Sequence, residues 1–474
     1  MRDPLISLAY LVSSILFILA LRGLSSPEQG RRGVFLGEIG MLIAVLATLV
    51  KREIVSYEWI AAGLLLGASI GTAISLRIPM TKMPERIAFS HAFGGLATAL
   101  VGVVEYHKLR GLFSDGAVRA VAEHGISRLT MGALGVEVFL GSLTFTGSII
   151  AFGKLQGMIT GAPVTWKGQN AINIGAFFGT LGLIGCLIAM PESAPHWMFL
   201  VVCATGLSLG FLAVLPIGGA DMPVVISLLN SYAGLAACAT GFALKSNILI
   251  IAGALDGSSG LLLSIIMSRA MNRSFANVVF GAFGGVEGKA PSAGAAARSY
   301  NEATVEDAAS VLRASRSVIV VPGYGMAVSQ AQHAVRDLAG ALEKNGTQVR
   351  YAIHPVAGRM PGHMNVLLAE ANVPYDTLYD LDAINDDFSH TDTVLVVGAN
   401  DVVNPGAKTD TASPIYGMPV FNVELARSVI VLKRSMNTGF SGVDNELFYL
   451  PNTMMVLGDA KKTIQSLSNE VKAG

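Results

Sequence analysis

The chain has 474 residues, of which 52% are hydrophobic and only 14% are charged, and its mean hydropathy is +0.55. This composition excludes an ordinary soluble protein of this length and predicts that most of the chain lies in a lipid bilayer. The 33 basic and 33 acidic residues balance to a formal net charge of zero, so no nucleic acid or other polyanionic partner is indicated.

Nine apolar segments are each long enough to cross the hydrocarbon layer, which takes about 20 helical residues. They are centred near residues 12, 41, 67, 95, 142, 180, 206, 232 and 258. The first segment has the apolar core of a secretory signal, but no A-x-A-like site follows it, so we expect a retained first helix. Of the 33 acidic residues, 19 lie in the last 174 positions, which predicts a soluble domain after the membrane part.

A few polar residues interrupt the apolar segments, and ionisable groups at bilayer depth are costly and usually functional. His91, in RIAFSHAFGGLATALVGVVEY, is a residue type that can take up and release protons near neutral pH. In ADMPVVISLLNSYAG, Asp221 starts a helix, and Ser227 and Asn230 share one face. The alternative for His91 is a buried histidine that ties two helices together. Further polar groups in these segments are Glu38, Glu137, Asp256 and Lys245.

The predicted organisation is a membrane domain at 1–272, a flexible linker at 273–302 and a soluble domain at 303–474. The linker follows from GVEGKAPSAGAAARSYNEATVED, which is rich in Gly, Ala, Ser and Pro. Thr304 is expected to cap the first helix of the soluble domain, with Asp307 completing a capping box. The three cysteines lie in apolar runs without metal-ligand spacing, so neither a disulfide nor a metal site is predicted.

In the soluble domain, short apolar runs alternate with amphipathic stretches. We expect buried parallel strands at SVIVVPG, QVRYAIHP, DTVLVVGAND, MPVFNV, SVIVLKRS and TMMVLGDA, and helices at 326–344 and 460–471. The chain is therefore predicted to be a polytopic α-helical membrane bundle followed by an α/β Rossmann-like, doubly wound parallel-sheet domain.

The turn after the first strand, VPGYGMAVSQAQ, has the spacing of a dinucleotide-binding turn. Gly323, Gly325 and Val328 fill that frame, in which the backbone and a helix N-terminus approach a pyrophosphate. VPGYG also matches a potassium-channel filter, but its position in the polar third of the chain argues against that reading.

The charges at two other strand ends favour NADP over NAD. The second strand ends in YAIHPVAGRMPG, which contains His354 and Arg359 and lacks the carboxylate that holds the ribose of NAD. Lys433, Arg434 and Ser435 end another strand and form a cationic fork suited to a phosphate monoester. The alternative is a basic rim exposed to solvent.

Longer strings resemble one family. PGYGMAVSQAQ, HPVAGRMPGHMNVLLAEA, INDDF, GANDVVNP and KRSMNTGFSGV resemble the NADP(H)-binding domain of proton-translocating nicotinamide nucleotide transhydrogenases. GGADMPVVISLLNSYAGLAA and AMNRSF resemble the membrane domain of the same family. The resemblance covers nearly the whole chain in the same order, and the chain has the size of the family's β subunit.

The resemblance implies a reaction and an assembly. Hydride passes from NADH, bound on a partner α subunit, to NADP⁺ bound on this chain, coupled to inward proton translocation. The chain itself carries one nucleotide fingerprint, and direct hydride transfer needs two nicotinamides in contact, so the NAD(H) site belongs to another polypeptide. A dimer of αβ units is implied, in a bacterial inner membrane with the NADP(H) domain in the cytoplasm.

The resemblance also implies roles for particular residues. His91 and Asn230 belong to the proton pathway, and Asp401 is coupled to the redox state of the nucleotide, although an Asp that caps a helix stays open as an alternative. Arg359 serves the pyrophosphate and the cationic fork the 2′-phosphate. The other implied nucleotide contacts are Gly323, Tyr324, Gly325, Val356, Ala357, Gly358, Met360, Pro361, Gly398, Ala399, Asn400, Val402, Gly439, Asp459 and Ala460.

Two rival classes stay open from the residues alone. One is a transporter or channel whose NADP domain senses redox state without nucleotide turnover. The other is a membrane anchor for a soluble NADP-binding enzyme. A sensor would gate flux without turnover, whereas an anchor would lose no activity when His91 is altered.

Overall fold

The computed structural model describes residues 2–26, 29–50, 57–79, 82–111, 126–161, 163–271, 275, 299–359, 362–411, 413, 415–438 and 442–473. These form two compact units, one of Met1–Ile217 with Val225–Ser264 and one of Gly218–Val224 with Ile265–Gly474. The predicted linker at 273–302 lies outside the described residues, apart from residues 275 and 299–302.

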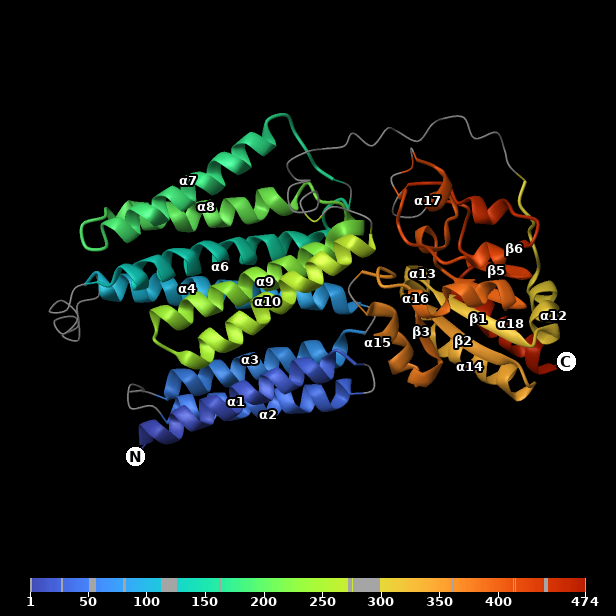
Figure 1. The fold of residues 1–474 in the computed structure, drawn as a ribbon, viewed down its shortest axis with the longest axis horizontal. Helices are drawn as coiled ribbons and strands as arrows, with labels where there is room; N and C mark the ends of the chain where they lie inside the picture. Colours follow the sequence, from blue (N-terminus) through green and yellow to red (C-terminus); the bar gives the residue numbers. More distant parts are fainter. Residues whose placement is uncertain are drawn as a thin grey trace. The chain divides into compact units, whose positions relative to one another are not determined.

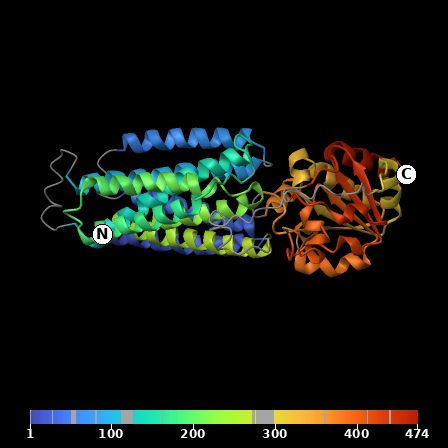
Figure 2. The same ribbon diagram turned by 90° about the horizontal axis from the view of Figure 1, so that it is seen from above.

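Nine helices in the described part of the chain are long and apolar enough to cross a membrane, as predicted. They run alongside one another in both views (Figures 1 and 2). They are α1 (Arg2–Leu24), α2 (Gly30–Leu49), α3 (Glu58–Arg77), α4 (Met83–Leu109), α6 (Arg128–Leu155), α7 (Gln169–Ala189), α8 (His196–Val214), α9 (Met222–Ala243) and α10 (Asn247–Ala270), with the 3₁₀ turn η2 (Gly219–Asp221) before α9.

Glycines allow the membrane helices to approach closely. A Cβ atom on Gly95 of α4 would lie 3.0 Å from the carbonyl oxygen of Gly141 on α6. A Cβ on Gly234 of α9 would lie 2.3 Å from the backbone nitrogen of Gly257 on α10. Because a side chain at either point would force the backbones apart, the small residue sets the spacing of each helix pair.

The soluble unit is built on a six-stranded sheet in the order β3-β2-β1-β4-β5-β6, with every pair parallel. Helices lie on both sides of this sheet (Figure 2). The order reverses between β1 and β4, which is the switch point where doubly wound folds bind ligands. The strands are β1 (Ser317–Pro322), β2 (Gln348–Ile353), β3 (Leu378–Asp380), β4 (Thr393–Val397), β5 (Ser428–Lys433) and β6 (Thr453–Leu457).

The core of this unit follows the two-residue period of the strands. Alternate positions such as Ile319, Val394 and Val429 pack with Phe388 and Phe421 in one fully buried cluster on one face. The other elements are α12 (Val305–Ala314), α13 (Tyr324–Ser329), α14 (Gln332–Lys344), α15 (His363–Glu370), η4 (Tyr375–Thr377), α16 (Leu381–Ile384), η5 (Asn385–His390), η6 (Asp401–Val403), α17 (Gly406–Thr409), η7 (Val423–Leu425), η8 (Glu446–Tyr449) and α18 (Ala460–Ala473).

The predicted capping box at the start of α12 is confirmed. The backbone N–H of Asp307 donates to Thr304 Oγ1 (3.2 Å), and the N–H of Thr304 donates to Asp307 Oδ2 (3.1 Å). The N–H and the hydroxyl of Thr304 both donate to the Asp307 carboxylate, and these two bonds hold the pKa of Asp307 below its usual value. The predicted helix at 326–344 is interrupted, because Gln330 adopts a left-handed conformation (φ 52°) between α13 and α14.

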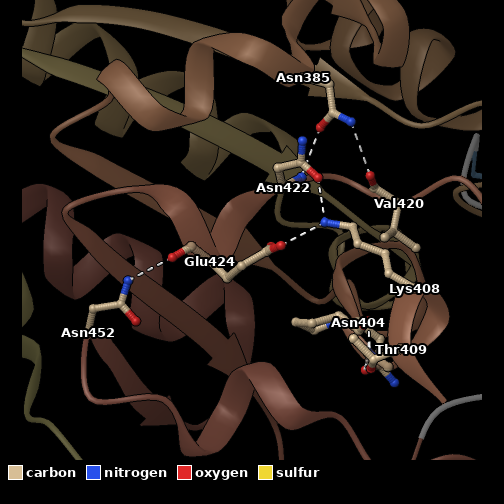
Figure 3. A network of polar contacts seen from close by, with 10 residues as sticks. Asn385, Asn404, Lys408, Thr409, Val420, Asn422, Glu424 and Asn452 are labelled. Atoms are coloured by element: carbon tan, nitrogen blue, oxygen red, sulfur yellow. Dashed lines mark hydrogen bonds and ion pairs between the residues drawn. The ribbon is translucent and has the colours of Figure 1, made fainter.

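The prediction of a strand at MPVFNV, residues 418–423, is wrong. Pro419 has no N–H to donate to a ladder. A side-chain amide satisfies this segment instead: Asn385 Nδ2 donates to the carbonyl of Val420 (3.2 Å), and Asn385 Oδ1 accepts from the N–H of Asn422 (2.8 Å) (Figure 3). The sixth strand is β3, whose three residues pair with the edge of β2 and are too few to show a period.

Candidate functional site

A cavity of ≈ 360 Å³ lies where β1, β4 and β5 end. Its lining includes turn residues that follow each of these strands, so the cavity lies at the switch point of the sheet. Of the positions expected to contact a nucleotide, those that line it are Gly323, Tyr324, Gly325, Val328, Val356, Ala357, Gly358, Gly398, Ala399, Asn400, Asp401, Val402, Lys433, Arg434 and Ala460.

Two glycine turns form the floor of this cavity. Gly323 N–H donates to the carbonyl of Val397, and Gly325 N–H to that of Gly398, both at 2.9 Å. A Cβ on Gly323 would lie 2.3 Å from Ala399 Cα, and one on Gly398, whose φ is +64°, would lie 2.4 Å from Gly325 Cα. The glycines are therefore required by the contact between the β1 and β4 turns as well as by any ligand.

A cation stacks on an aromatic ring beside the cavity. The guanidinium carbon of Arg359 lies 4.4 Å from the centre of the Tyr324 ring, so residues from the β2 and β1 turns meet there. The N–H of Arg359 donates to Nδ1 of His363 (3.0 Å). Burial, with a smaller effect of the Arg359 charge, lowers the pKa of His363 to about 4, so this imidazole is neutral at pH 7 and carries its proton on Nε2.

His354 is a structural residue and not a phosphate ligand, which corrects its contribution to the predicted basic strand end. Its Nε2–H donates to the carbonyl of Pro419 (2.8 Å), and the N–H of Val356 donates to its Nδ1 (3.3 Å). Burial lowers its pKa to about 4, so it is neutral under ordinary conditions.

Two adjacent cations stand at the end of β5. Lys433 Nζ donates to the carbonyl of Asn437 (2.5 Å) and lies 4.6 Å from the centre of the Phe448 ring. Burial lowers the pKa of Lys433, and the carboxylates of Asp444 and Asp401 oppose that effect. Arg434 is exposed, and its Nη2 is 3.8 Å from Asp459 Oδ2, a separation at which a surface ion pair contributes little.

The acidic residue in GAND does not take a helix-cap position. Asn400 precedes η6, and Asp401 is the first residue of that turn. The side chain of Asn445 holds Asn400 by donating to its backbone carbonyl (2.9 Å) and its side-chain oxygen (3.2 Å). Asp401 consequently faces the cavity near the charge of Lys433.

Some predicted contacts lie elsewhere. Met360, Pro361 and Gly439 are outside the described residues. Arg359, Ser435 and Asp459 are described but do not line the cavity. Asp459 Oδ1 accepts the N–H of Lys462 (3.2 Å) at the start of α18. Lining residues that were not among the predicted contacts include Ser329, Met418, Leu432 and Gly458.

In the membrane unit, polar side chains from four helices meet. Nδ1 of His91 (α4) lies 3.2 Å from Oγ of Ser148 (α6), and the side chain of Asn230 (α9) is a second hydrogen-bonding neighbour of the ring. Nδ2 of Asn230 donates to Oδ1 of Asp256 (α10) at 3.0 Å. Neither Ser148 nor Asp256 was predicted as part of this cluster, because nothing local in the sequence indicates which helices are neighbours.

The other membrane candidates take different positions. Ser227 donates to the carbonyl of Gly260 (2.9 Å), so it ties α9 to α10 rather than contacting His91. Asp221 lies in η2, before α9, and is buried. Glu137 is buried on α6 against Gly102 of α4.

Comparison with known proteins bears on both units. The family described as NAD(P) transhydrogenase beta subunit matches residues 6–470. Two sequences from Rhodospirillum rubrum, both named NAD(P) transhydrogenase subunit beta, are 50% identical to this chain over 470 residues, which is 98% of this chain and 99% of each relative. The chain belongs to this family. Its match takes in the nine helices and the sheet together.

Proposed function

We propose that this chain is the NADP(H)-binding and proton-translocating subunit of an NAD(P) transhydrogenase. Together with an α subunit that holds NAD(H), it transfers hydride from NADH to NADP⁺ as a proton moves inward across the membrane. The observation that carries the proposal is the family match over both units, with a cavity at the switch point of the sheet. The active assembly is a dimer of αβ units in a bacterial inner membrane, with the sheet domain in the cytoplasm.

The residues around the cavity support NADP(H) as its ligand. Tyr324 and the glycine turns border it, and the Arg359 guanidinium stands beside Tyr324 to serve the pyrophosphate. Lys433 and Arg434 supply two cations for the 2′-phosphate. Bound NADP(H) would supply the nicotinamide carbon that accepts or gives the hydride.

The protein groups bind and orient in this reaction and need not exchange protons with the nicotinamides. Hydride transfer requires the two reactive carbons about 3–3.5 Å apart, so the turns must present one face of the nucleotide to the partner subunit and exclude water. Asp401 lies near the charge of Lys433 and senses the charge of the nucleotide that this lysine holds.

The membrane helices carry the proton whose movement drives the reaction. His91 is the group that takes and releases the proton, with Asn230 and Ser148 as hydrogen-bonding neighbours. A membrane potential of roughly 150 mV contributes about 3.5 kcal/mol per proton, a several-hundredfold bias on an otherwise balanced exchange. One proton per hydride is therefore sufficient to drive the reaction toward NADPH.

Nucleotide choice tests the sheet domain. Lys433→Ala with Arg434→Ala is expected to weaken NADPH binding at least a hundredfold, because two cations facing the 2′-phosphate are lost, and to leave weak NADH binding unchanged. The matched control removes two exposed lysines outside the cavity, Lys344→Ala with Lys472→Ala, and should bind normally. Equal loss for both nucleotides, measured by calorimetry, would refute the assignment of the fork.

Proton coupling tests the membrane domain. In sealed vesicles with the α subunit, the wild-type chain is expected to acidify the lumen during hydride transfer in one direction and to alkalinise it in the other. His91→Ala should abolish this proton movement, whereas Thr98→Ala, which removes a hydroxyl that donates to the Gly94 carbonyl within α4, should retain it. Proton-coupled turnover at the wild-type rate in His91→Ala would exclude the proposed role.

A further inference from the structure

Asn230 has two side-chain neighbours on different helices. Its Nδ2 donates to Asp256 Oδ1 at 3.0 Å, and the His91 ring is its other hydrogen-bonding neighbour. An amide has one donating end and one accepting end, whereas an ionised carboxylate only accepts. The contact with Asp256 therefore turns the amide nitrogen toward α10 and the amide oxygen toward His91.

Nε2 of the His91 ring is the nitrogen that can pair with the Asn230 amide oxygen. Nδ1 is in contact with the Ser148 hydroxyl, whereas Nε2 is buried and makes no hydrogen bond of full geometry in the described part of the chain. An amide oxygen turned toward the ring can accept the Nε2 proton. Since the two ends of an amide are told apart only by their partners, Asp256 is the group that decides which end of Asn230 faces the histidine.

Two serine hydroxyls and a close glycine contact join α9 to α10 without using the side chains of Asn230 and Asp256. Ser231 donates to the carbonyl of Gly257 (2.7 Å) and Ser227 to that of Gly260 (2.9 Å). The backbones meet at Gly234, where a Cβ would lie 2.3 Å from Gly257 N. Because these contacts between α9 and α10 do not use the Asp256 side chain, we expect them to persist when its carboxylate is removed.

Asp256 is exposed in this chain, in a helix long and apolar enough to span a membrane. An ionisable group at that depth is costly. A side chain that only filled space between α9 and α10 would be better apolar, since the neighbouring contacts there are between glycines and serines. The hydrogen bond from Asn230 uses the Asp256 carboxylate as an acceptor.

We propose that Asp256 is a positioning residue for proton transfer, which fixes the amide of Asn230 with its oxygen toward His91 Nε2. This rests on the proposed function, in which His91 carries the proton. Asp256 itself need not exchange that proton. Its effect on His91 passes through Asn230, which distinguishes it from an independent proton carrier or a packing residue.

A double-mutant cycle in the complete αβ assembly tests this coupling. Asp256→Leu is expected to lower proton-coupled turnover in sealed vesicles at least tenfold, with NADPH affinity unchanged. In an Asn230→Ala background the same substitution should change turnover less than twofold, because the amide to be oriented is gone. Asp256→Asn keeps an acceptor oxygen and should recover most of the activity. Ser258→Ala, which removes an exposed hydroxyl bonded within α10, is the matched control.

Equal fold-losses in the two backgrounds, or a wild-type rate in Asp256→Leu, would overturn the inference. A second readout does not require proton movement: the ¹⁵N resonances of His91, identified by their absence in His91→Gln. They should shift in Asp256→Leu as they do in Asn230→Ala, and stay in place in Ser258→Ala. Vesicles that move no protons with the wild-type chain would refute the proposed function, whereas unshifted His91 resonances in Asp256→Leu would refute the positioning role.

Discussion

His354 and His363 in the sheet domain and His91 in the membrane unit are held by different kinds of partner. In the sheet domain, His354 bonds to the carbonyl of Pro419 and the N–H of Val356, and His363 accepts the N–H of Arg359, all of them backbone groups. In the membrane unit, His91 has the side chains of Ser148 and Asn230 as neighbours. The difference follows from the backbone, because loops leave N–H and C=O groups free, whereas a helix uses them within itself.

This difference determines how easily the surroundings of each histidine can change. A histidine fixed by backbone groups changes its environment only when the chain changes its fold. A histidine held by side chains can exchange partners when a rotamer turns, at no cost to the helix. The sheet domain therefore has two fixed histidines beside residues that line the cavity, and the membrane unit has a histidine, His91, whose contacts can be switched.

The largest expected effect concerns the sheet domain, where backbone contacts fix the structure. Gly323→Ala would place a Cβ 2.3 Å from Ala399 Cα, where backbone meets backbone and no side chain can move aside. We expect the free energy of unfolding of the sheet domain to fall by about 3 kcal/mol or more, with loss of NADPH binding. The measurement is hydrogen exchange of the β1 and β4 amides.

Gly340→Ala is the matched control, because a Cβ there meets only Arg336 Nη1 at 3.8 Å within α14. It should leave NADPH binding unchanged and stabilise the helix by about 1 kcal/mol. A similar loss of stability in both variants would show that the contact between the two glycine turns is not what requires Gly323.

Much of the sheet domain was predictable because its signals are local. Five strands, the cap at Thr304 and the glycine turns each lie within a few consecutive residues. Prediction failed where a distant residue decided the structure. The run at 418–423 has the composition of a strand, but the Asn385 amide, more than thirty positions earlier, takes its backbone groups out of any ladder (Figure 3).

The membrane cluster was predictable only in part for the same physical reason. The nine spans follow from composition, and His91 and Asn230 stand out as polar residues in apolar runs. Their partners, Ser148 and Asp256, lie 57 and 26 positions away on other helices. The sequence periodicity of one helix does not show which neighbouring helix its faces contact. The contacts of His91 and Asn230 could therefore be seen only in the structure.

A smaller effect per residue is expected from pH, and it sharpens the comparison. The pKa of His354 and of His363 is lowered to about 4 in the folded protein, whereas the value in an unfolded chain is near 6.5. The unfolded state therefore binds more protons between pH 6.5 and pH 4, and stability falls as the pH drops through this window. At pH 5 each histidine is expected to cost about 2 kcal/mol relative to pH 8.

Hydrogen-exchange protection of β1 and β4 in the solubilised chain, measured from pH 8 to pH 5, checks this. His363→Gln should remove about half of the pH-dependent loss. His390→Gln, at an exposed histidine on η5, should remove none. A pH dependence that survives both His354→Gln and His363→Gln would mean that other groups control it.

The smallest effect tests the side-chain contacts in the membrane. Gly95 lies one turn from His91 on α4, and a Cβ there would stand 2.9 Å from Phe145 N on α6. Gly95→Ala should move α4 from α6 by a few tenths of an ångström, lowering stability by roughly 1 kcal/mol and weakening the His91–Ser148 contact. Proton-coupled turnover in vesicles should fall several-fold, while NADPH binding, in the other unit, stays unchanged.

The adjacent Gly94 provides the control, because no atom lies within 4 Å of a Cβ built there. Gly94→Ala adds the same methyl group to the same helix, one residue away, and should leave both stability and turnover at the wild-type level. If the two alanines lowered turnover equally, the spacing of α4 and α6 would not control His91. A loss confined to Gly95→Ala would instead show that helix contact distance sets which side chains the histidine can reach.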